Sequence, residues 1–140
     1  MGKRREAREL ALMCLHQWDV RGADDGVDLA GQLIREASAD EEVKEFARSL
    51  LDTYWDNRML IDETIAAAAS NWKFDRIAVV DRCVLRLAVA ELEGCPDIPP
   101  RVTLDEAIEV AKKFSTANSG SFVNGILDRI LTERETEHGA

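Results

Sequence analysis

The sequence has few of the residues that build disulfide frameworks, metal centres and common catalytic sites. It contains three cysteines and two histidines in 140 residues. Cys14, Cys83 and Cys95 lie far apart, are odd in number and form no CxxC motif. We therefore expect no disulfide framework, no zinc site and no cofactor. A reducing cytoplasmic location fits this cysteine usage best.

Long hydrophobic runs are also missing. No apolar stretch approaches the roughly 18 residues that a membrane span needs, so we expect no membrane segment. The N-terminus, MGKRREARE, is basic, but no apolar segment follows it as one would in a signal peptide.

Motifs of common enzyme classes are absent as well. The sequence contains no GxSxG, no GxxxxGK[ST] and no HExxH motif, and no cysteine has a nearby His–Asp set. His16 and His138 each stand alone. We therefore expect a protein that is not an enzyme.

What the chain does have is an acidic body with a basic N-terminus. Its formal net charge is −9, which disfavours a general polyanion binder. The first eight residues carry a local charge of +3, from Lys3, Arg4, Arg5 and Arg8 against Glu6. Such an end could contact a phosphate chain, although short charge runs are more often simply solvated.

Apolar residues recur at helical spacing along the chain, and no segment alternates as a strand would. The pattern therefore predicts an all-α domain of six or seven helices. The expected helices cover 4–19, 27–38, 41 to about 70 with a break at WDNR (55–58), 75–93, a helix opened by a capping box at 103–106, and a last helix after the linker 115–121.

The segment 75–93 is apolar almost all the way round, which is typical of a central helix. Its charged residues share a narrow stripe that includes Arg82 and Arg86, but Asp81 and Glu91 stand in or beside buried arcs. A buried carboxylate needs a partner. Two interpretations are open: an internal ion pair or helix cap, or a carboxylate that awaits a partner protein.

Three stretches carry a family resemblance. VVDRCVLRLAVAEL (79–92) and IPPRVTLDEAIEVAKKFSTANSGSFVNGILDRI (98–130) are similar to the second half of the NusB family of bacterial transcription antitermination factors. RREARELALMCLHQWD (4–19) resembles that family's first helix. The resemblance implies a single domain over 1–140, built as two packed helical subdomains. We expect a short disordered tail at about 134–140.

The resemblance also implies a function. Members of this family bind the boxA element of nascent ribosomal RNA leader transcripts without catalysis. They do so as a heterodimer with NusE, a protein of the small ribosomal subunit, and join an antitermination complex on RNA polymerase. Single-stranded RNA is the expected ligand, because its bases are free to stack and to offer their edges.

Site residues follow from the same resemblance. Arginine suits RNA because its planar guanidinium grips phosphate and stacks on bases. The implied RNA-binding residues are Lys3, Arg4, Arg5, Arg8, Asn118, Ser119 and Phe122, and the implied NusE-binding residues are His16 and Asp81. A single RNA site further requires the first and last helices to begin close together in space.

Within the resemblance, the turn-like dipeptide Asn124-Gly125 belongs to the last helix. Gly125 would be explained by a neighbouring helix backbone that crosses there, and Asn124 by a bond to a neighbouring chain end. Phe122 is either a core residue or an aromatic that stacks on a base.

The chain departs from the family at Ser121, where a basic residue is common, and at Ala90, where an aromatic is common. Two alternatives are therefore kept. One is a protein-interaction scaffold of the same fold without RNA binding. The other is a stand-alone relative of the RNA-binding domain of an rRNA cytosine methyltransferase.

Overall fold

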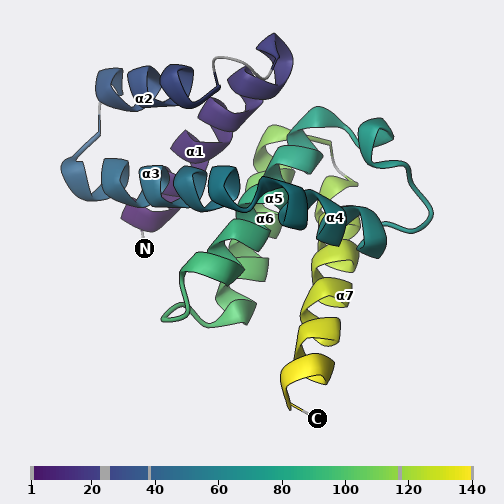
Figure 1. The fold of residues 1–140 in the computed structure, drawn as a ribbon. Helices are drawn as coiled ribbons and strands as arrows, with labels where there is room; N and C mark the ends of the chain where they lie inside the picture. Colours follow the sequence, from purple (N-terminus) through teal and green to yellow (C-terminus); the bar gives the residue numbers. More distant parts are fainter. Residues whose placement is uncertain (1, 23–25, 38, 117, 140) are drawn as a thin grey trace.

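The computed structural model describes residues 2–22, 26–37, 39–116 and 118–139. Over these ranges the chain forms seven α-helices and one 3-10 turn, without a strand, so the predicted all-α fold is confirmed (Figure 1). The elements are α1 (Gly2–Arg21), α2 (Gly26–Glu36), α3 (Glu41–Asp56), α4 (Arg58–Ala68), η1 (Phe74–Arg76), α5 (Val79–Gly94), α6 (Pro100–Phe114) and α7 (Ser119–Gly139).

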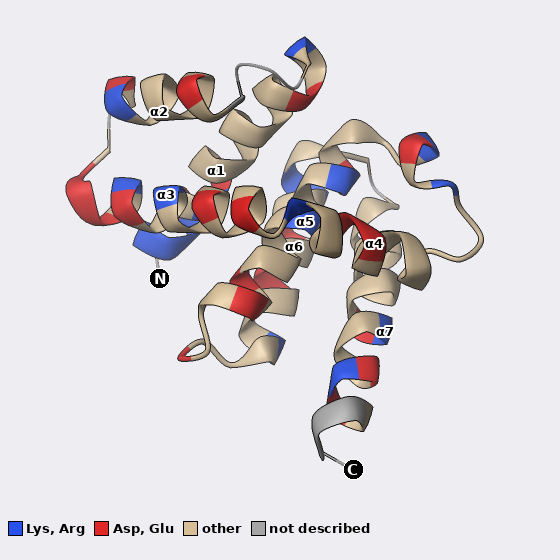
Figure 2. Ribbon diagram, viewed as in Figure 1, with Lys and Arg blue, Asp and Glu red and all other residues tan. Residues whose placement is uncertain are grey.

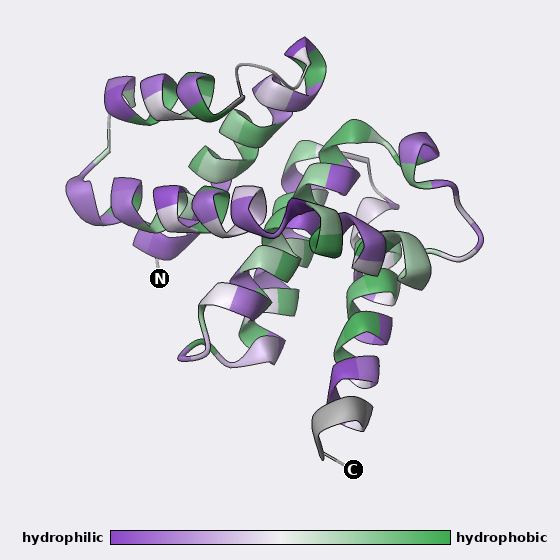
Figure 3. Cartoon of the chain, viewed as in Figure 1, coloured by the Kyte–Doolittle hydropathy of each residue, from purple (hydrophilic) through white to green (hydrophobic). Residues whose placement is uncertain are grey.

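The helices form two packed groups, as predicted. α1, α2 and α3 pack on one another, and α7 packs on α4, α5 and α6. α5 contacts both groups and lies at the centre of the molecule (Figures 1 and 3). Ten of its side chains are buried, which explains its nearly continuous apolar sequence. None of the helices in the described ranges combines the length and apolarity needed to cross a membrane.

Local features mark the end of α1, the start of α3 and the break between α3 and α4. Gly22 follows α1 with φ of 98°, a left-handed conformation that glycine adopts without steric cost. The side chain of Asp40 accepts a hydrogen bond from the Val43 amide and caps α3. The expected break at 55–58 occurs at Asn57, between α3 and α4.

The central helix begins later than the sequence predicts. Residues 74–76 form the separate turn η1, and Ile77 and Ala78 are extended before α5 starts at Val79. The guanidinium of Arg82 stabilises this arrangement by donating to the carbonyl of Ile77 at 3.0 Å. A helix pattern alone does not reveal such a tertiary hydrogen bond.

The predicted capping box at 103–106 is wrong. α6 begins at Pro100, with Pro99 as its N-cap residue, because proline suits the first turn of a helix, where its missing N–H has no partner to lose. Thr103 therefore lies one turn inside α6, and its hydroxyl donates to Glu91 at 2.6 Å instead.

The dipeptide Asn124-Gly125 lies within α7, as predicted. The proposed reason for Gly125 is wrong, because an added Cβ would meet nothing within 4 Å. Asn124 is also exposed.

α7 extends through Gly139, into the segment 134–140 for which a disordered tail is expected. Arg134 on this helix pairs with Glu93 of α5, and this pair holds the C-terminal part of α7 against α5. Ala140 lies outside the described residues.

Candidate nucleic-acid and partner interfaces

The basic residues at the start of α1 are neutralised by carboxylates of other elements. Lys3 lies 3.3 Å from both Asp40 and Glu42, beside the acidic start of α3 (Figure 2). Arg4 lies 3.6 Å from Asp97, in the connection between α5 and α6. These pairs are exposed, and solvent screening leaves exposed pairs with little net stabilisation. A phosphate could therefore displace the carboxylates at low cost.

Arg5 forms a two-pronged contact with Glu106 of α6. Its Nε and Nη2 donate to the two carboxylate oxygens at 3.0 and 2.8 Å. This hydrogen bonding to Arg5 holds the pKa of the Glu106 carboxyl below its usual value. The pair anchors α1 to α6.

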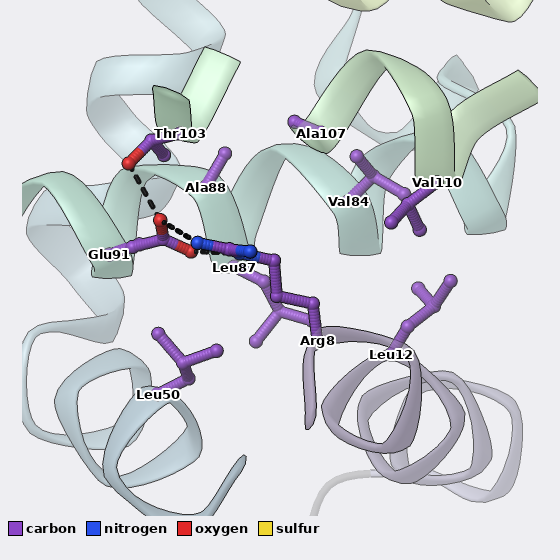
Figure 4. A pocket seen from close by; sticks show the side chains of 10 residues that line it. All are labelled: Arg8, Leu12, Leu50, Val84, Leu87, Ala88, Glu91, Thr103, Ala107 and Val110. Atoms are coloured by element: carbon purple, nitrogen blue, oxygen red, sulfur yellow. Dashed lines mark hydrogen bonds and ion pairs between the residues drawn. The ribbon is translucent and has the colours of Figure 1, made fainter. Parts of the chain in front are cut away.

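Arg8 differs from the other three because it is buried, with 8% of its surface exposed. Its Nε and Nη2 each donate to Glu91 at 2.8 Å, and Thr103 completes the cluster from α6 (Figure 4). Of the two interpretations of Glu91, the internal ion pair is confirmed. Arg8 joins α1 to the central helix and does not offer its guanidinium to the surface.

A second internal cluster corrects the prediction that Arg86 lies on a polar stripe. Arg86 is buried and donates to Asp19 of α1 at 3.1 Å and to Asp62 of α4 at 3.0 Å. Arg82 also donates to Asp19, and the Tyr54 hydroxyl donates to Asp62 at 3.1 Å. Burial raises the pKa of Tyr54, so its hydroxyl stays protonated as a donor. The cluster joins helices of both groups.

Asp81 bonds the side chain of the first residue of α7, and no ion pair or bond from a backbone amide to its carboxylate is found among the described residues. Asp81 is 7% exposed, and its Oδ2 accepts a hydrogen bond from Ser119 Oγ at 3.2 Å, at the start of α7. Ser119 is also buried and bonds the side chains of Ser115 and Thr116. Within the described part of the chain, Asp81 Oδ1 has no hydrogen-bond partner. One oxygen of this buried carboxylate thus lacks a donor.

His16 is half-buried and lines an open groove of about 520 Å³. The groove is mainly apolar, and its walls include Val80 and Phe114, which directly precede Asp81 and Ser115 in the chain. Glu6 and Glu9 add negative charge to it. Sequence reasoning found His16 but not the groove, because its walls come from helices far apart in sequence.

Among the described residues α6 packs against both α1 and α7, but α1 and α7 do not pack on each other, so the expected adjacency of their first turns is not found. A second groove of about 310 Å³ is lined by Arg5, Glu9, Lys112 and Lys113, among others. Lys113 pairs with Glu9 at 3.0 Å. The side chain of Lys112 lies 3.0 Å from the Cβ position of Gly120, in the first turn of α7. The groove thus connects Arg5 to the start of α7.

Phe122 and Asn118 lie beyond this groove. Asn118 is exposed, whereas Phe122 is half-buried and packs partly against the core. The Phe122 ring meets the indole of Trp72 edge to face, with centroids 5.8 Å apart. Phe122 thus packs partly against the core, and its stacking on a base stays a prediction. The sequence analysis missed Trp72, and it missed Lys112 and Lys113 although they stand as an adjacent pair just before the linker.

No trio of histidine, cysteine or acidic side chains in the described ranges is arranged to hold a metal ion. The three cysteines are free thiols. Burial raises the pKa of Cys14 to about 11 and that of Cys83 to about 12, so both are protonated at neutral pH.

Comparisons with known proteins agree with the resemblance. The sequence model of the NusB family matches residues 5–132. The transcription antitermination protein NusB of Symbiobacterium thermophilum is 44% identical, and the match covers 98% of this chain and 94% of that protein. The protein of the same name from Desulforapulum autotrophicum is 39% identical over 99% of this chain and 98% of its own length.

Solved structures give the same result. T. maritima NusB is 43% identical, with a TM-score of 0.86 over 93% of this chain and 91% of that chain. A structure of antitermination factors NusB and NusE in complex with dsRNA matches with 30% identity and a TM-score of 0.84, over 95% of this chain and 98% of that chain. This chain therefore belongs to the NusB family.

Proposed function

We propose that this protein binds boxA RNA of ribosomal RNA leader transcripts together with NusE in the bacterial cytoplasm. The resulting heterodimer would join the antitermination complex on RNA polymerase. Membership of the NusB family supports the proposal, as does the similarity to the solved complex of NusB, NusE and RNA. The observation that carries it is the surface that runs from Arg5 through the Lys112–Lys113 groove to Asn118 and Phe122.

On this surface, Lys3, Arg4 and Arg5 would bind phosphates by exchanging their carboxylate partners for RNA. Asn118 and Phe122 would meet the bases. Ser119 is buried and would act indirectly, by fixing the start of α7. Arg8 would likewise act by holding α1 in place, because its Nε and Nη2 both donate to Glu91.

We propose single-stranded RNA as the preferred ligand, although the solved relative holds a duplex. A half-buried aromatic side chain can stack only on a base that is unpaired. A duplex would offer mainly shape and phosphates, for which a net charge of −9 is a poor match.

NusE would bind along the groove lined by His16. The free Oδ1 of Asp81 would accept a hydrogen bond or positive charge from NusE, since a buried oxygen without a donor is costly. The two glutamates of the groove favour a partner surface that combines apolar and basic side chains.

One observation favours the second candidate, a scaffold of this fold without RNA binding. Each of the four basic residues near the N-terminus already has a carboxylate partner. No observation singles out the third candidate, a relative of the methyltransferase RNA-binding domain.

Fluorescence anisotropy tests the proposal. Labelled boxA RNA, a scrambled single strand and a boxA duplex are titrated with the protein, with and without NusE. We expect the tightest binding for single-stranded boxA in the presence of NusE. NusE binding without binding of any RNA would instead establish the scaffold. Equal affinity for the duplex and the single strand would refute the strand preference alone.

A further inference from the structure

Trp72 is an exposed tryptophan in the short connection between α4 and η1, with 57% of its surface open to solvent. Its backbone amide donates to the carbonyl of Ala69 at 2.9 Å, which fixes the turn that carries it. Its indole lies against Phe122 at an interplanar angle of 82°. In this edge-to-face arrangement the edge of one ring meets one face of the other, so the remaining ring surface of the exposed Trp72 stays available for a further planar group.

The same turn borders one face of α7. At 100° per residue, Phe122, Gly125 and Arg129 fall within about 60° of one another around the helix. Arg129 donates from Nη1 to the carbonyl of Ala68 at 3.0 Å and to Ser70 Oγ at 3.1 Å. The guanidinium is therefore held beside the turn that carries Trp72, while Gly125 leaves the surface between Phe122 and Arg129 open.

The described basic side chains around Trp72 and Phe122 lack carboxylate partners, unlike the basic side chains near the N-terminus. Among the described residues, Lys73, Arg76 and Arg129 have no carboxylate within ion-pair distance, whereas Lys3, Arg4, Arg5 and Arg8 all do.

Two acidic residues belong to the same region. Asp128 is engaged by Arg101 at 3.6 Å, and Asp75 is exposed within η1. The three cations therefore outnumber the acids near Trp72, in a protein that is acidic as a whole. An anionic ligand with planar groups fits this combination of charge and aromatic surface.

We propose that Trp72 and Phe122 form a stacking platform for an unpaired RNA base, and that Lys73 and Arg129 hold the phosphates beside it. The proposal rests on the proposed function and extends the RNA surface past Phe122. Aromatic side chains bind every base through its π-face, so the platform contributes affinity for single strands rather than recognition of one base. It also accounts for the exposure of a large apolar side chain at this place.

Two measurements test the platform with the full chain, NusE and single-stranded boxA RNA. The first is tryptophan emission, which a stacked base should quench. Trp18 and Trp55 lie together inside the fold, with centroids 5.4 Å apart, and provide a background that Trp72→Phe isolates. We expect quenching in the wild type and its loss in this variant.

The second measurement is RNA affinity. Trp72→Ala should weaken binding about tenfold, because stacking on one aromatic side chain is worth about that much. Trp72→Phe should retain most of the affinity. Val20→Ala, at an exposed apolar residue on α1, is the matched control and should bind like the wild type.

The outcomes separate this proposal from the proposed function. The platform would be overturned, and the proposed function left intact, if Trp72→Ala binds RNA with wild-type affinity and RNA does not quench the emission of the wild type. Equal quenching by a blunt duplex would also overturn it, because a paired base cannot stack on the platform. If the wild type with NusE binds no RNA, both proposals fail. If circular dichroism shows that Trp72→Ala is misfolded, the platform is judged from the quenching in the wild type and from the RNA affinity of Trp72→Phe.

Discussion

Ser119 Oγ donates a hydrogen bond to Asp81 Oδ2 at 3.2 Å and so ties the first residue of α7 to the central helix. The bond connects the two surfaces of the molecule. Asp81 follows Val80 of the His16 groove, and Ser119 follows Asn118 of the proposed RNA surface. The other carboxylate oxygen, Oδ1, is buried and has no hydrogen-bond partner among the described residues, so the same residue holds α7 and still lacks one donor.

Substitutions at the two ends of this bond should have different effects. Asp81→Ala should weaken NusE binding by ~2 kcal/mol or more if the contact is desolvated, because it removes the carboxylate whose Oδ1 lacks an internal donor. Ser119→Ala keeps that acceptor and should leave NusE affinity near the wild-type value. Both should lower stability by about 1 kcal/mol, through loss of the shared hydrogen bond. Calorimetric titration with NusE and thermal unfolding separate the two effects; equal NusE affinities would assign Asp81 to internal structure only.

The buried pair of Arg8 and Glu91 should dominate the stability of the interface between α1 and α5. Glu91→Ala removes both 2.8 Å contacts of the buried Arg8 guanidinium and leaves it only a 3.5 Å contact with Glu106, which should cost ~3–5 kcal/mol. Arg4→Ala is the control, since its pair with Asp97 is exposed and should contribute under ~1 kcal/mol. Urea unfolding measures both. A loss below ~1 kcal/mol in Glu91→Ala would contradict the role given to the pair.

This pair also shows where sequence reasoning reached its limit. The helical pattern correctly placed Glu91 in a buried arc, because periodicity reports which face is covered. It could not show that Arg8 is the partner, since the two lie 83 positions apart. Arg8 was therefore grouped with its exposed neighbours as an RNA ligand. The late start of α5 and the role of Thr103 were missed because each depends on a specific side-chain hydrogen bond, from Arg82 to Ile77 and from Thr103 to Glu91, which periodicity does not report.

The family resemblance reached further than the residue pattern. It supplied the two helical groups and the correct helical reading of Asn124-Gly125, neither of which follows from turn propensity. It did not supply Trp72, Lys112 or Lys113, because their positions beside Phe122 and Gly120 depend on how α4, α6 and α7 pack.

Salt dependence tests the proposed phosphate contacts of the N-terminal residues. Arg4→Ala combined with Arg5→Ala should lower the slope of log affinity against log salt by about 1.4, at roughly 0.7 per contact on a single strand. Arg8 is left unchanged because it is buried and its loss would destabilise the protein. Arg21→Ala, an exposed arginine at the other end of α1, is the control. An unchanged slope in the double variant would remove both arginines from the RNA surface.

The contact of Arg5 with Glu106 predicts a specific acid sensitivity. Because the pKa of Glu106 is lower in the folded protein than in the unfolded chain, the folded state binds fewer protons. The stabilisation is complete above the unfolded pKa of about 4.3 and is lost as the pH falls through the folded pKa. Glu106→Gln should flatten this part of the stability curve between pH 6 and 3.

Urea unfolding at a series of pH values measures this sensitivity, and NMR titration follows the carboxyl directly. In Arg5→Ala the pKa of Glu106 should return toward its usual value. A Glu106 carboxyl that titrates normally in the wild type would mean that the two-pronged contact is not maintained in solution.

Two glycines provide the last test, because their surroundings differ. Gly125 lies in the middle of α7 with open space at its Cβ position, so Gly125→Ala should stabilise the protein by up to ~1 kcal/mol through helix propensity. Gly94 ends α5, and an added Cβ would lie 2.8 Å from Thr53 Oγ1. Gly94→Ala should therefore destabilise the protein, because Thr53 and its helix α3 must shift. Thermal unfolding of the two variants should show midpoints that move in opposite directions. A loss of stability in Gly125→Ala would indicate that a backbone does approach α7 at this position after all.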